Sequence, residues 1–347
     1  MKNQRRKLEA NFIRDKAPEF NIIVGQSKKL LREIAKAIKA SKADSNILIF
    51  GEHGTGKELF ARAIHMASDR RNKPFVKVNC AAIPDTLIES EFFGYEEGAF
   101  TGARKGGKIG LFQQANGGTL FLDEVGDLSL SAQAKLLTAI QDKEFIRIGG
   151  NKAISVDIRI IAATNKNLKE LIGQDKFRED LYYRLNVVRI DLPPLTERDN
   201  DIEVLANYFL HFYCKRMGVN KSISSQVMER LKEHHWPGNV RELFNVIEYS
   251  IIMSEDVEIQ LGDLPAYLID FSEKETEKAD WELDHEFDKI ADKMKNKKWK
   301  EIKDELEYRF MKAMIKRFRN KSELIKSLGM SRSQFYSILK KIDEKEQ

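Results

Sequence analysis

Residues 46–57 read NILIFGEHGTGK and contain the strongest indication of the fold. The apolar run Asn46–Phe50 leads into a loop with three glycines and a lysine, and a helical pattern follows. Glycines let backbone N–H groups turn inward around phosphate oxygens, and the N-terminus of the helix adds a favourable dipole. The spacing Gly-x4-Gly-Lys therefore predicts a phosphate-binding loop in which Lys57 reaches the β- and γ-phosphates. The predicted binding residues are Gly51, Glu52, His53, Gly54, Thr55, Gly56, Lys57 and Glu58.

The last position of this motif departs from the general pattern. It holds Glu58, where a Ser or Thr hydroxyl usually ligates magnesium. A glycine-rich turn that binds no ligand is therefore an alternative, as far as this loop alone is concerned.

Polar residues at the ends of two later apolar runs support the phosphate site. Residues 117–122 lead into Asp123 and Glu124, and Ile158–Ala162 is followed closely by Asn165. We expect Asp123 to hold Mg²⁺ through water and Glu124 to polarise the attacking water. Asn165 could sense the γ-phosphate or hold that water. The alternative, two acids that only cap the next helix, is weakened by the upstream loop.

Short apolar runs alternate with helical patterns between residues 46 and 192, which predicts an α/β fold. Runs of four or five residues without polar alternation are typical of strands buried on both faces of a parallel sheet. Pro193-Pro194 ends this pattern, because proline continues neither a ladder nor a helix interior. From Asp199 to about Leu264 the pattern is helical, with no strand-like run. The predicted strands are Asn46–Phe50, Phe75–Val78, Thr119–Leu122, Ile158–Ala162 and Val187–Asp191.

Composition and charge describe a chain with a core and a basic end. Of 347 residues 42% are hydrophobic, and the net charge is +5. Residues 308–341 hold ten Lys or Arg against the single acidic residue Glu323. No run is long and apolar enough to span a bilayer, and residues 1–16 lack the apolar core of a secretory signal. We expect a cytoplasmic protein without membrane contact, in which Cys80 and Cys214 are buried free thiols.

The basic end contains two capping boxes separated by a glycine. Residues 320–323 (NKSE) and 331–334 (SRSQ) each begin a predicted helix, and Gly329 ends the first. Two short helices, a glycine turn and a basic surface predict a DNA-binding helix-turn-helix. A small dimerisation bundle is the alternative. The candidate DNA contacts are Ser331, Arg332, Ser333, Gln334 and Ser337.

Residues 93–103 read FGYEEGAFTGA and carry the most specific motif of the chain. Gly98 and Gly102 flank a mobile loop tip that presents Phe100 and Thr101 to a partner. The hexapeptide resembles the signature loop of the sigma-54-dependent transcriptional activators, a family of AAA+ ATPases. It lies between the phosphate-binding loop and the acidic strand end in the family's order. Because the family's loop reads GExGTGKE, Glu58 is normal for it, and the missing hydroxyl no longer argues against ATP.

The resemblance implies several further residue roles. Residues 177–185 (FREDLYYRL) resemble the segment whose arginines, Arg178 and Arg184, reach the ATP of a neighbouring subunit. Residues 236–243 (WPGNVREL) resemble the lid motif, with Arg241 as a second sensor. Asn79 matches the position that restrains the catalytic glutamate, and Ile23 and Val24 lie in the segment beside the adenine. The residues implied to contact sigma-54 are Gly98, Ala99, Phe100, Thr101, Gly102 and Ala103.

Together these features predict five regions. They are a basic tail (1–20), an AAA+ α/β subdomain with a parallel sheet covered by helices on both faces (21–192), an all-α lid (193–268), a charged linker (269–305) and a helix-turn-helix of the factor-for-inversion-stimulation type (306–347).

The resemblance also implies the cofactors and partners. These are ATP and Mg²⁺, the sigma-54 RNA polymerase holoenzyme, double-stranded enhancer DNA and further copies of the chain in a hexameric ring. Two other functions stay open: a DNA-bound regulator that uses ATP only to assemble, and an AAA+ unfoldase or helicase. Too few residues precede the ATPase domain for a sensor domain. Either a separate regulatory protein controls the chain, or a sensor was removed from it.

Overall fold

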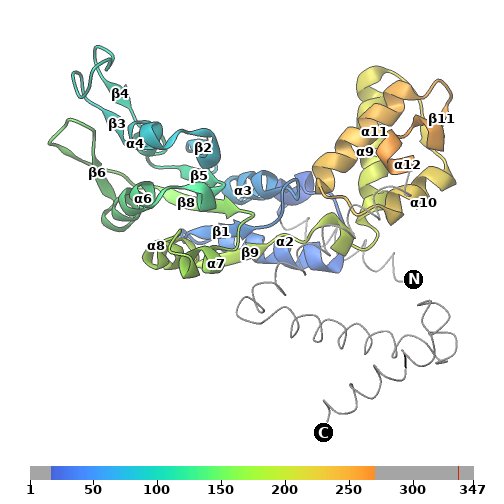
Figure 1. The fold of residues 1–347 in the computed structure, drawn as a ribbon, viewed down its shortest axis with the longest axis horizontal. Helices are drawn as coiled ribbons and strands as arrows, with labels where there is room; N and C mark the ends of the chain where they lie inside the picture. The colour runs from blue at the N-terminus through green and yellow to red at the C-terminus, as the bar shows by residue number, and fades with distance from the viewer. Residues whose placement is uncertain (1–16, 270–334, 336–347) are drawn as a thin grey trace, which may run out of the picture. The chain divides into compact units, whose positions relative to one another are not determined.

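A computed structural model describes residues 17–269 and Phe335. Its centre is a five-stranded parallel sheet with the strand order β2-β5-β8-β1-β9 (Figure 1). All five predicted strands are present, and each lies within one or two residues of its predicted bounds. They are β1 (Ile47–Phe50), β2 (Phe75–Asn79), β5 (Thr119–Asp123), β8 (Arg159–Thr164) and β9 (Val188–Asp191).

Helices cover both faces of this sheet, which confirms the predicted α/β class. Alternate residues of each strand enter two separate cores, because successive side chains of a strand point to opposite faces. Ile47 and Ile49 pack with the helices α2 and α3, whereas Leu48 packs with those that include α4 and α6. The helices are α2 (Lys28–Ser41), α3 (Lys57–Met66), α4 (Asp85–Phe93), α5 (Leu111–Gln114), α6 (Leu130–Asp142), α7 (Leu168–Gly173) and α8 (Glu179–Leu185).

Two small antiparallel hairpins extend from the α/β unit, and neither was predicted from the sequence. The strands β3 (Gly94–Tyr95) and β4 (Lys108–Ile109) flank the GAFTGA segment, and β6 (Glu144–Ile146) pairs with β7 (Ala153–Ser155). Figure 1 shows both hairpins at the same end of the unit. Strands of two or three residues are too short to produce a period-two pattern.

The segment after Pro193-Pro194 forms a helical lid, as predicted. It has a separate apolar core around Trp236 and Tyr213. The expectation of a segment without strands was wrong in one detail, because β10 (Ser222–Ile223) and β11 (Glu258–Ile259) pair in parallel. The helices of the lid are α9 (Asp201–Met217), α10 (Ser225–Glu233), α11 (Asn239–Met253) and α12 (Ala266–Ile269).

Two expectations about the chain as a whole can be compared with the described residues. Cys80 and Cys214 are both buried and free, as predicted. No helix between residues 17 and 269 combines the length and the apolar character that a membrane crossing requires. Residues 1–16 of the predicted basic tail, most of the predicted linker and the predicted DNA-contact residues lie outside the described residues. Ala17 and Phe20, at the end of the predicted tail, are described and are buried in the core of the α/β unit. Of the residues predicted to form a helix-turn-helix, Phe335 is described, and it is helical and buried.

Candidate active site

The phosphate-binding loop joins the end of β1 to the start of α3. Gly54 and Gly56 have φ values of +75° and +102°, a region that favours glycine. A Cβ atom on Gly54 would lie 2.1 Å from the carbonyl oxygen of Gly238 in the lid. The buried Lys57 ammonium donates to the carbonyl of Gly51 at 2.9 Å. The loop is thus a tight cradle that holds its lysine inward, as phosphate binding requires.

Glu58 lies outside this cradle, on the first turn of α3. Its carboxylate pairs with Arg62 at 2.9 Å and with Lys77 at 2.6 Å. Burial by itself would raise the pKa of Glu58, but the two cations outweigh it and lower the pKa. In this structure Glu58 belongs to a surface ion-pair group rather than to the phosphate cradle.

The carboxyl ends of β1, β5 and β8 bring the predicted catalytic residues together. These strands are neighbours in the sheet and run in parallel, so the residues that follow them meet at one edge. The ammonium of Lys57 lies 3.3 Å from Oε1 of Glu124. Glu124 itself has a φ of +53°, which is uncommon for a residue with a side chain.

His53, from the middle of the loop, contacts two of the predicted catalytic residues. Its Nε2 lies 2.7 Å from Nδ2 of Asn165, and its Nδ1 lies 3.5 Å from Oε1 of Glu124. The His53 side chain is 64% exposed. An imidazole therefore bridges the strand end of β8 and the strand end of β5.

Asp123 and Glu124 each have a buried oxygen without a hydrogen-bond partner in the described part of the chain. These atoms are Oδ1 of Asp123 and Oε2 of Glu124. Burial, and next the charge of Glu124, raise the pKa of Asp123 above its ordinary value. A buried, unpaired carboxylate oxygen beside a lysine suits a hydrated divalent cation, because carboxylate and water oxygens are the ligands that Mg²⁺ prefers. The residues present therefore fit Mg²⁺ and a triphosphate.

Asn79 is paired with Asp123 where β2 lies beside β5. Asp123 immediately precedes Glu124 in the sequence. The side-chain oxygen of Asn79 accepts a hydrogen bond from the backbone N–H of Ala81 at 3.0 Å. In this structure the contacts of Glu124 are with Lys57 and His53 instead. The restraint of Glu124 by Asn79 stays a prediction.

Two buried side chains connect the phosphate-binding loop to the lid. Asn239, at the start of α11, donates from Nδ2 to the carbonyl of His53 and to the carboxylate of Glu52, both at 3.0 Å. Arg198 donates to the carbonyl of Thr55 at 2.8 Å. Burial lowers the pKa of Arg198 to about 10, and this residue still carries a positive charge at neutral pH. The lid is thus bonded directly to the backbone of the loop.

The remaining predicted nucleotide contacts lie around the same edge. Arg241 is exposed on the first turn of α11, and its Cβ would be 3.2 Å from a Cβ placed on Gly54. Ile23 is buried in the core of the α/β unit, whereas Val24 packs against the core of the lid. The segment predicted to lie beside the adenine therefore runs along the junction of sheet and lid.

Arg178 and Arg184 lie at the two ends of α8, and their described side-chain contacts are not with residues of this edge. Arg178 precedes α8, is exposed and forms an ion pair with Asp180 at 2.7 Å. Arg184, at the end of α8, donates to the carbonyl of Ile140 at 3.3 Å.

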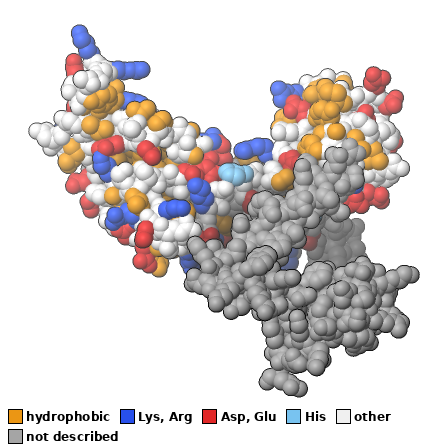
Figure 2. Space-filling view, in the orientation of Figure 1, with side chains coloured by type: hydrophobic (Ala, Val, Ile, Leu, Met, Phe, Trp, Pro, Cys, Tyr) orange, Lys and Arg blue, Asp and Glu red, His pale blue; other side chains and the backbone are white. Residues whose placement is uncertain are grey.

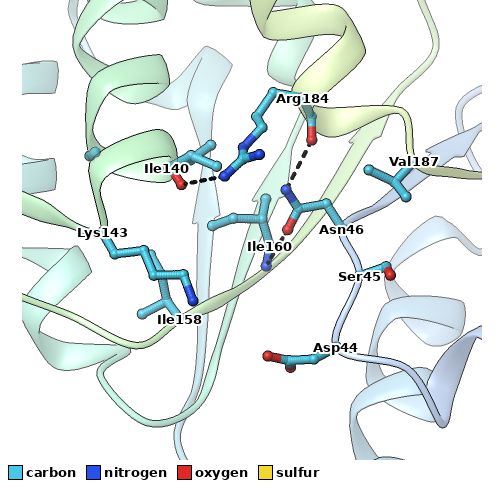
Figure 3. A pocket seen from close by; sticks show the side chains of 10 residues that line it. Asp44, Ser45, Asn46, Ile140, Lys143, Ile158, Ile160, Arg184 and Val187 are labelled. Carbon is cyan, nitrogen blue, oxygen red and sulfur yellow. Dashed lines mark hydrogen bonds between the residues drawn. The ribbon is translucent and has the colours of Figure 1, made fainter.

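Figure 3 shows Arg184 in a cavity of about 200 Å³, together with Asn46, whose amide donates to the Arg184 carbonyl at 2.9 Å. Asn46 precedes β1, and the phosphate-binding loop follows the other end of that strand. A four-residue strand is roughly 13 Å long. Arg184 is therefore remote from the phosphate site of its own chain.

The GAFTGA segment forms the tip between β3 and β4. Gly98 and Gly102 have φ values of +79° and +97°, and no atom lies within 4 Å of a Cβ placed on either glycine. The Phe100 side chain is 45% exposed, with its ring 5.0 Å from that of Tyr95. Thr101 is exposed. Figure 2 shows Lys and Arg side chains at this tip.

Sequence reasoning missed three contacts around this site. No signal identified His53 as the bridge between Glu124 and Asn165, because it occupies a position without a defined role in the loop motif. Nor did the sequence indicate the buried lid contacts of Arg198 and Asn239. Asn239 lies within the recognised lid motif, but the motif assigned a role only to Arg241.

Comparison with known proteins identifies two matching family models. The first, the sigma-54 interaction domain, matches residues 23–191, and the second, the AAA+ ATPase lid domain, matches residues 196–281. A protein of Escherichia coli (strain K12) named as the uric acid sigma-54-dependent transcriptional regulator UacR is 54% identical over 67% of this chain and 40% of its own length. The Nif-specific regulatory protein of Azotobacter vinelandii is 50% identical over 70% of this chain and 47% of its own length.

Solved structures agree with these matches. NtrX from Brucella abortus in complex with ADP has a TM-score of 0.66 and 33% identity, over 98% of this chain and 73% of that chain. The same protein in complex with ATP has a TM-score of 0.65 and 32% identity, over 97% of this chain and 72% of that chain. The present chain spans less than half the length of the two curated relatives named above. It belongs to the family of sigma-54-dependent transcriptional activators, whose central domain is an AAA+ ATPase domain.

Proposed function

We propose that this chain hydrolyses ATP in a ring of identical subunits and uses the energy to remodel the closed complex of sigma-54 RNA polymerase. The convergence of Lys57, Asp123, Glu124 and Asn165 at one edge of the sheet supports the hydrolytic part. The ATP and ADP complexes of NtrX support a nucleotide in this fold. When bound, ATP would supply the γ-phosphoryl group that is transferred to water, with ADP as the leaving group, and Mg²⁺ would neutralise charge on the phosphate oxygens.

Each residue at this edge has a role that follows from its chemistry. Lys57 binds phosphate oxygens, and Asp123 holds Mg²⁺ through water with its unpaired oxygen. Glu124 accepts a proton from the attacking water, with its second carboxylate oxygen buried and available. Asn165 senses the γ-phosphate. Arg241, exposed beside Gly54, reports the nucleotide to the lid.

We assign Arg178 and Arg184 to the site of a neighbouring subunit. Arg184 is remote from the phosphate site of its own chain, so it can reach a nucleotide only in another copy. A guanidinium supplied in this way stabilises negative charge in the transition state and makes hydrolysis depend on assembly. The hydrogen bond of Arg184 to Ile140 has to break when the ring forms.

The exposed tip Gly98–Ala103 is the observation that carries the polymerase-remodelling proposal. It lies on a hairpin outside the phosphate site, and nothing among the described residues packs against its two glycines, Gly98 and Gly102. An exposed aromatic ring and a hydroxyl on such a tip suit contact with a protein partner. Binding to upstream double-stranded DNA through residues 306–347 completes the proposal.

A Thr101 variant tests this assignment. Thr101→Ala should keep ATP hydrolysis within a few-fold of wild type, because the residue is distant from the phosphate edge. It should fail to capture sigma-54 in the presence of ADP and aluminium fluoride, and it should not open promoter complexes. Recovery with Thr101→Ser would identify the hydroxyl as the contact.

Full promoter opening by Thr101→Ala would refute the role of the tip. Failure of the wild-type chain itself to open promoter complexes would favour the alternative function, a DNA-binding regulator that ATP assembles but that does not remodel polymerase.

A further inference from the structure

His53 is one of the predicted loop residues, and its side chain, to which the loop motif gives no role, lies between Asn165 and Glu124. Nδ2 of Asn165 donates to Nε2 of His53 at 2.7 Å. Since Nε2 accepts this bond, the proton of the neutral ring is on Nδ1. That N–H is 3.5 Å from Oε1 of Glu124. The bond to Asn165 therefore fixes the tautomer that can donate to Glu124.

Glu124 contacts the cation Lys57 and the donor His53. ATP binding requires Lys57 to move to phosphate oxygens, whereas it does not require His53 to move. Lys57, 3.3 Å away, must turn to phosphate oxygens if it is to perform its role in the loop. His53 does not have to move to phosphate, because its side chain is largely exposed and its ring already accepts a hydrogen bond from Asn165. After Lys57 leaves, His53 is the contact that still holds Oε1 of Glu124.

We propose that His53 is a positioning residue that restrains Glu124 until Asn165 engages the γ-phosphate. This inference rests on the proposed ATP hydrolysis. A donor beside Oε1 of Glu124 stabilises the carboxylate in its present orientation, in which the unpartnered oxygen Oε2 is buried. The carboxylate has to turn before Oε2 can accept a proton from water. When Asn165 turns to phosphate, His53 loses the bond that fixes its tautomer. The ring is then free to release Glu124.

Three substitutions at this exposed position separate the two contacts. His53→Ser removes both contacts. His53→Gln places an amide where Nε2 was, so it can still meet Asn165 but not Glu124. His53→Asn places an amide where Nδ1 was, so it can still meet Glu124 but not Asn165. His211→Ser, on the exposed side of α9, is the matched control.

The kinetic test compares these variants at saturating ATP, without sigma-54, at protein concentrations that support assembly. The Ser and Gln variants should hydrolyse ATP about two- to fivefold faster than wild type, because one weak polar contact with the base, the 3.5 Å approach of Nδ1 to Oε1, is lost. The Asn variant should be slower than the Gln variant by a similar factor. Affinity for ATP should stay within about twofold throughout, since a restraint on the base does not bind nucleotide. A lower rate in the Ser variant, or equal rates in the Gln and Asn variants, would overturn the proposal.

A spectroscopic test does not depend on hydrolysis. In ¹⁵N-labelled protein without nucleotide, the His53 imidazole, recognised by its absence in His53→Gln, should show a protonated Nδ1 and an unprotonated Nε2. Addition of ADP, Mg²⁺ and beryllium fluoride should abolish this fixed tautomer. An Nε2-protonated ring before addition would overturn the inference. A wild-type chain without ATPase activity would instead refute the proposed function, and this spectrum would still decide whether the contact exists.

Discussion

Replacement of Asn239 tests how the lid is attached to the phosphate-binding loop. This residue is fully buried, has a φ of +52° and uses both ends of its amide. Besides its bonds to Glu52 and His53, Oδ1 accepts from the buried N–H of Leu195 at 2.7 Å. Loss of the amide leaves that N–H unpaired, which costs ~1–3 kcal/mol, and removes the bond to the His53 carbonyl, which contributes ~0.5–1.5 kcal/mol. The bond to exposed Glu52 adds little.

The two losses sum to ~1.5–4.5 kcal/mol. Asn239→Gly should lower the free energy of unfolding by about 2–3 kcal/mol, in the lower part of this range, because glycine adopts the left-handed backbone without strain. Asn239→Ala should lower it by about 1 kcal/mol more, because alanine also pays the strain of the left-handed backbone. At ~2–4 °C per kcal/mol, these losses correspond to decreases in Tm of roughly 4–12 °C and 6–16 °C. The control is Asn245→Ala on the exposed side of α11, which should change stability by no more than about 0.5 kcal/mol.

Thermal unfolding followed by circular dichroism and urea titration measure these changes, and a fluorescent ATP analogue measures affinity. We expect the Gly and Ala variants to bind nucleotide more weakly than the control, because the lid loses a bond to the loop backbone. If Asn239→Ala were as stable as Asn245→Ala, the buried hydrogen bonds would not hold the lid. If the Ala and Gly variants were equally stable, the left-handed backbone would carry no strain.

Three further predictions concern other parts of the chain. Because burial raises the pKa of Asp123, its carboxylate costs the folded state stability at neutral pH. Asp123→Asn should therefore raise Tm at pH 7, and this gain should shrink as the pH falls toward the ordinary carboxyl pKa and vanish below it. Arg184→Ala should bind ATP without hydrolysing it. The ATPase activity per subunit of the wild-type chain should rise with protein concentration. If that activity stayed constant at dilutions where sedimentation shows only monomers, action in a neighbouring subunit would be refuted. A chain without residues 306–347 should keep ATPase activity and lose site-specific binding in a DNA mobility-shift assay, and retained binding would place the DNA surface elsewhere.

The sheet and its catalytic edge could be predicted because each depends on local sequence. A parallel strand buried on both faces needs a continuous apolar run, and Ile158–Ala162 is such a run. The order of strands in space does not follow from any one run, but the motifs that follow β1, β5 and β8 require those strands to be neighbours. The predicted positions of Lys57, Asp123 and Glu124 therefore come together in the structure.

What the sequence could not predict depends on contacts between distant segments. His53 meets Asn165 across 112 positions of the chain, and Asn239 meets Glu52 across 187. Neither pair has a periodic pattern or a fixed spacing. The short hairpins could not be predicted for another reason. The strands β6 and β7 have three residues each, too few for a periodic pattern, and their hairpin packs on the GAFTGA segment.

That packing also explains how the exposed tip is supported. Ile148 bonds with Gly94 at 3.0 Å, and a Cβ on Gly149 would lie 2.7 Å from that of Ala99. The hairpin that makes these contacts follows α6 directly, and α6 begins a few residues after Glu124. The base of the tip is thus joined to the catalytic strand end through one helix and one hairpin. Because packed elements of this kind move as units rather than deform continuously, a shift of α6 would displace the base of the tip.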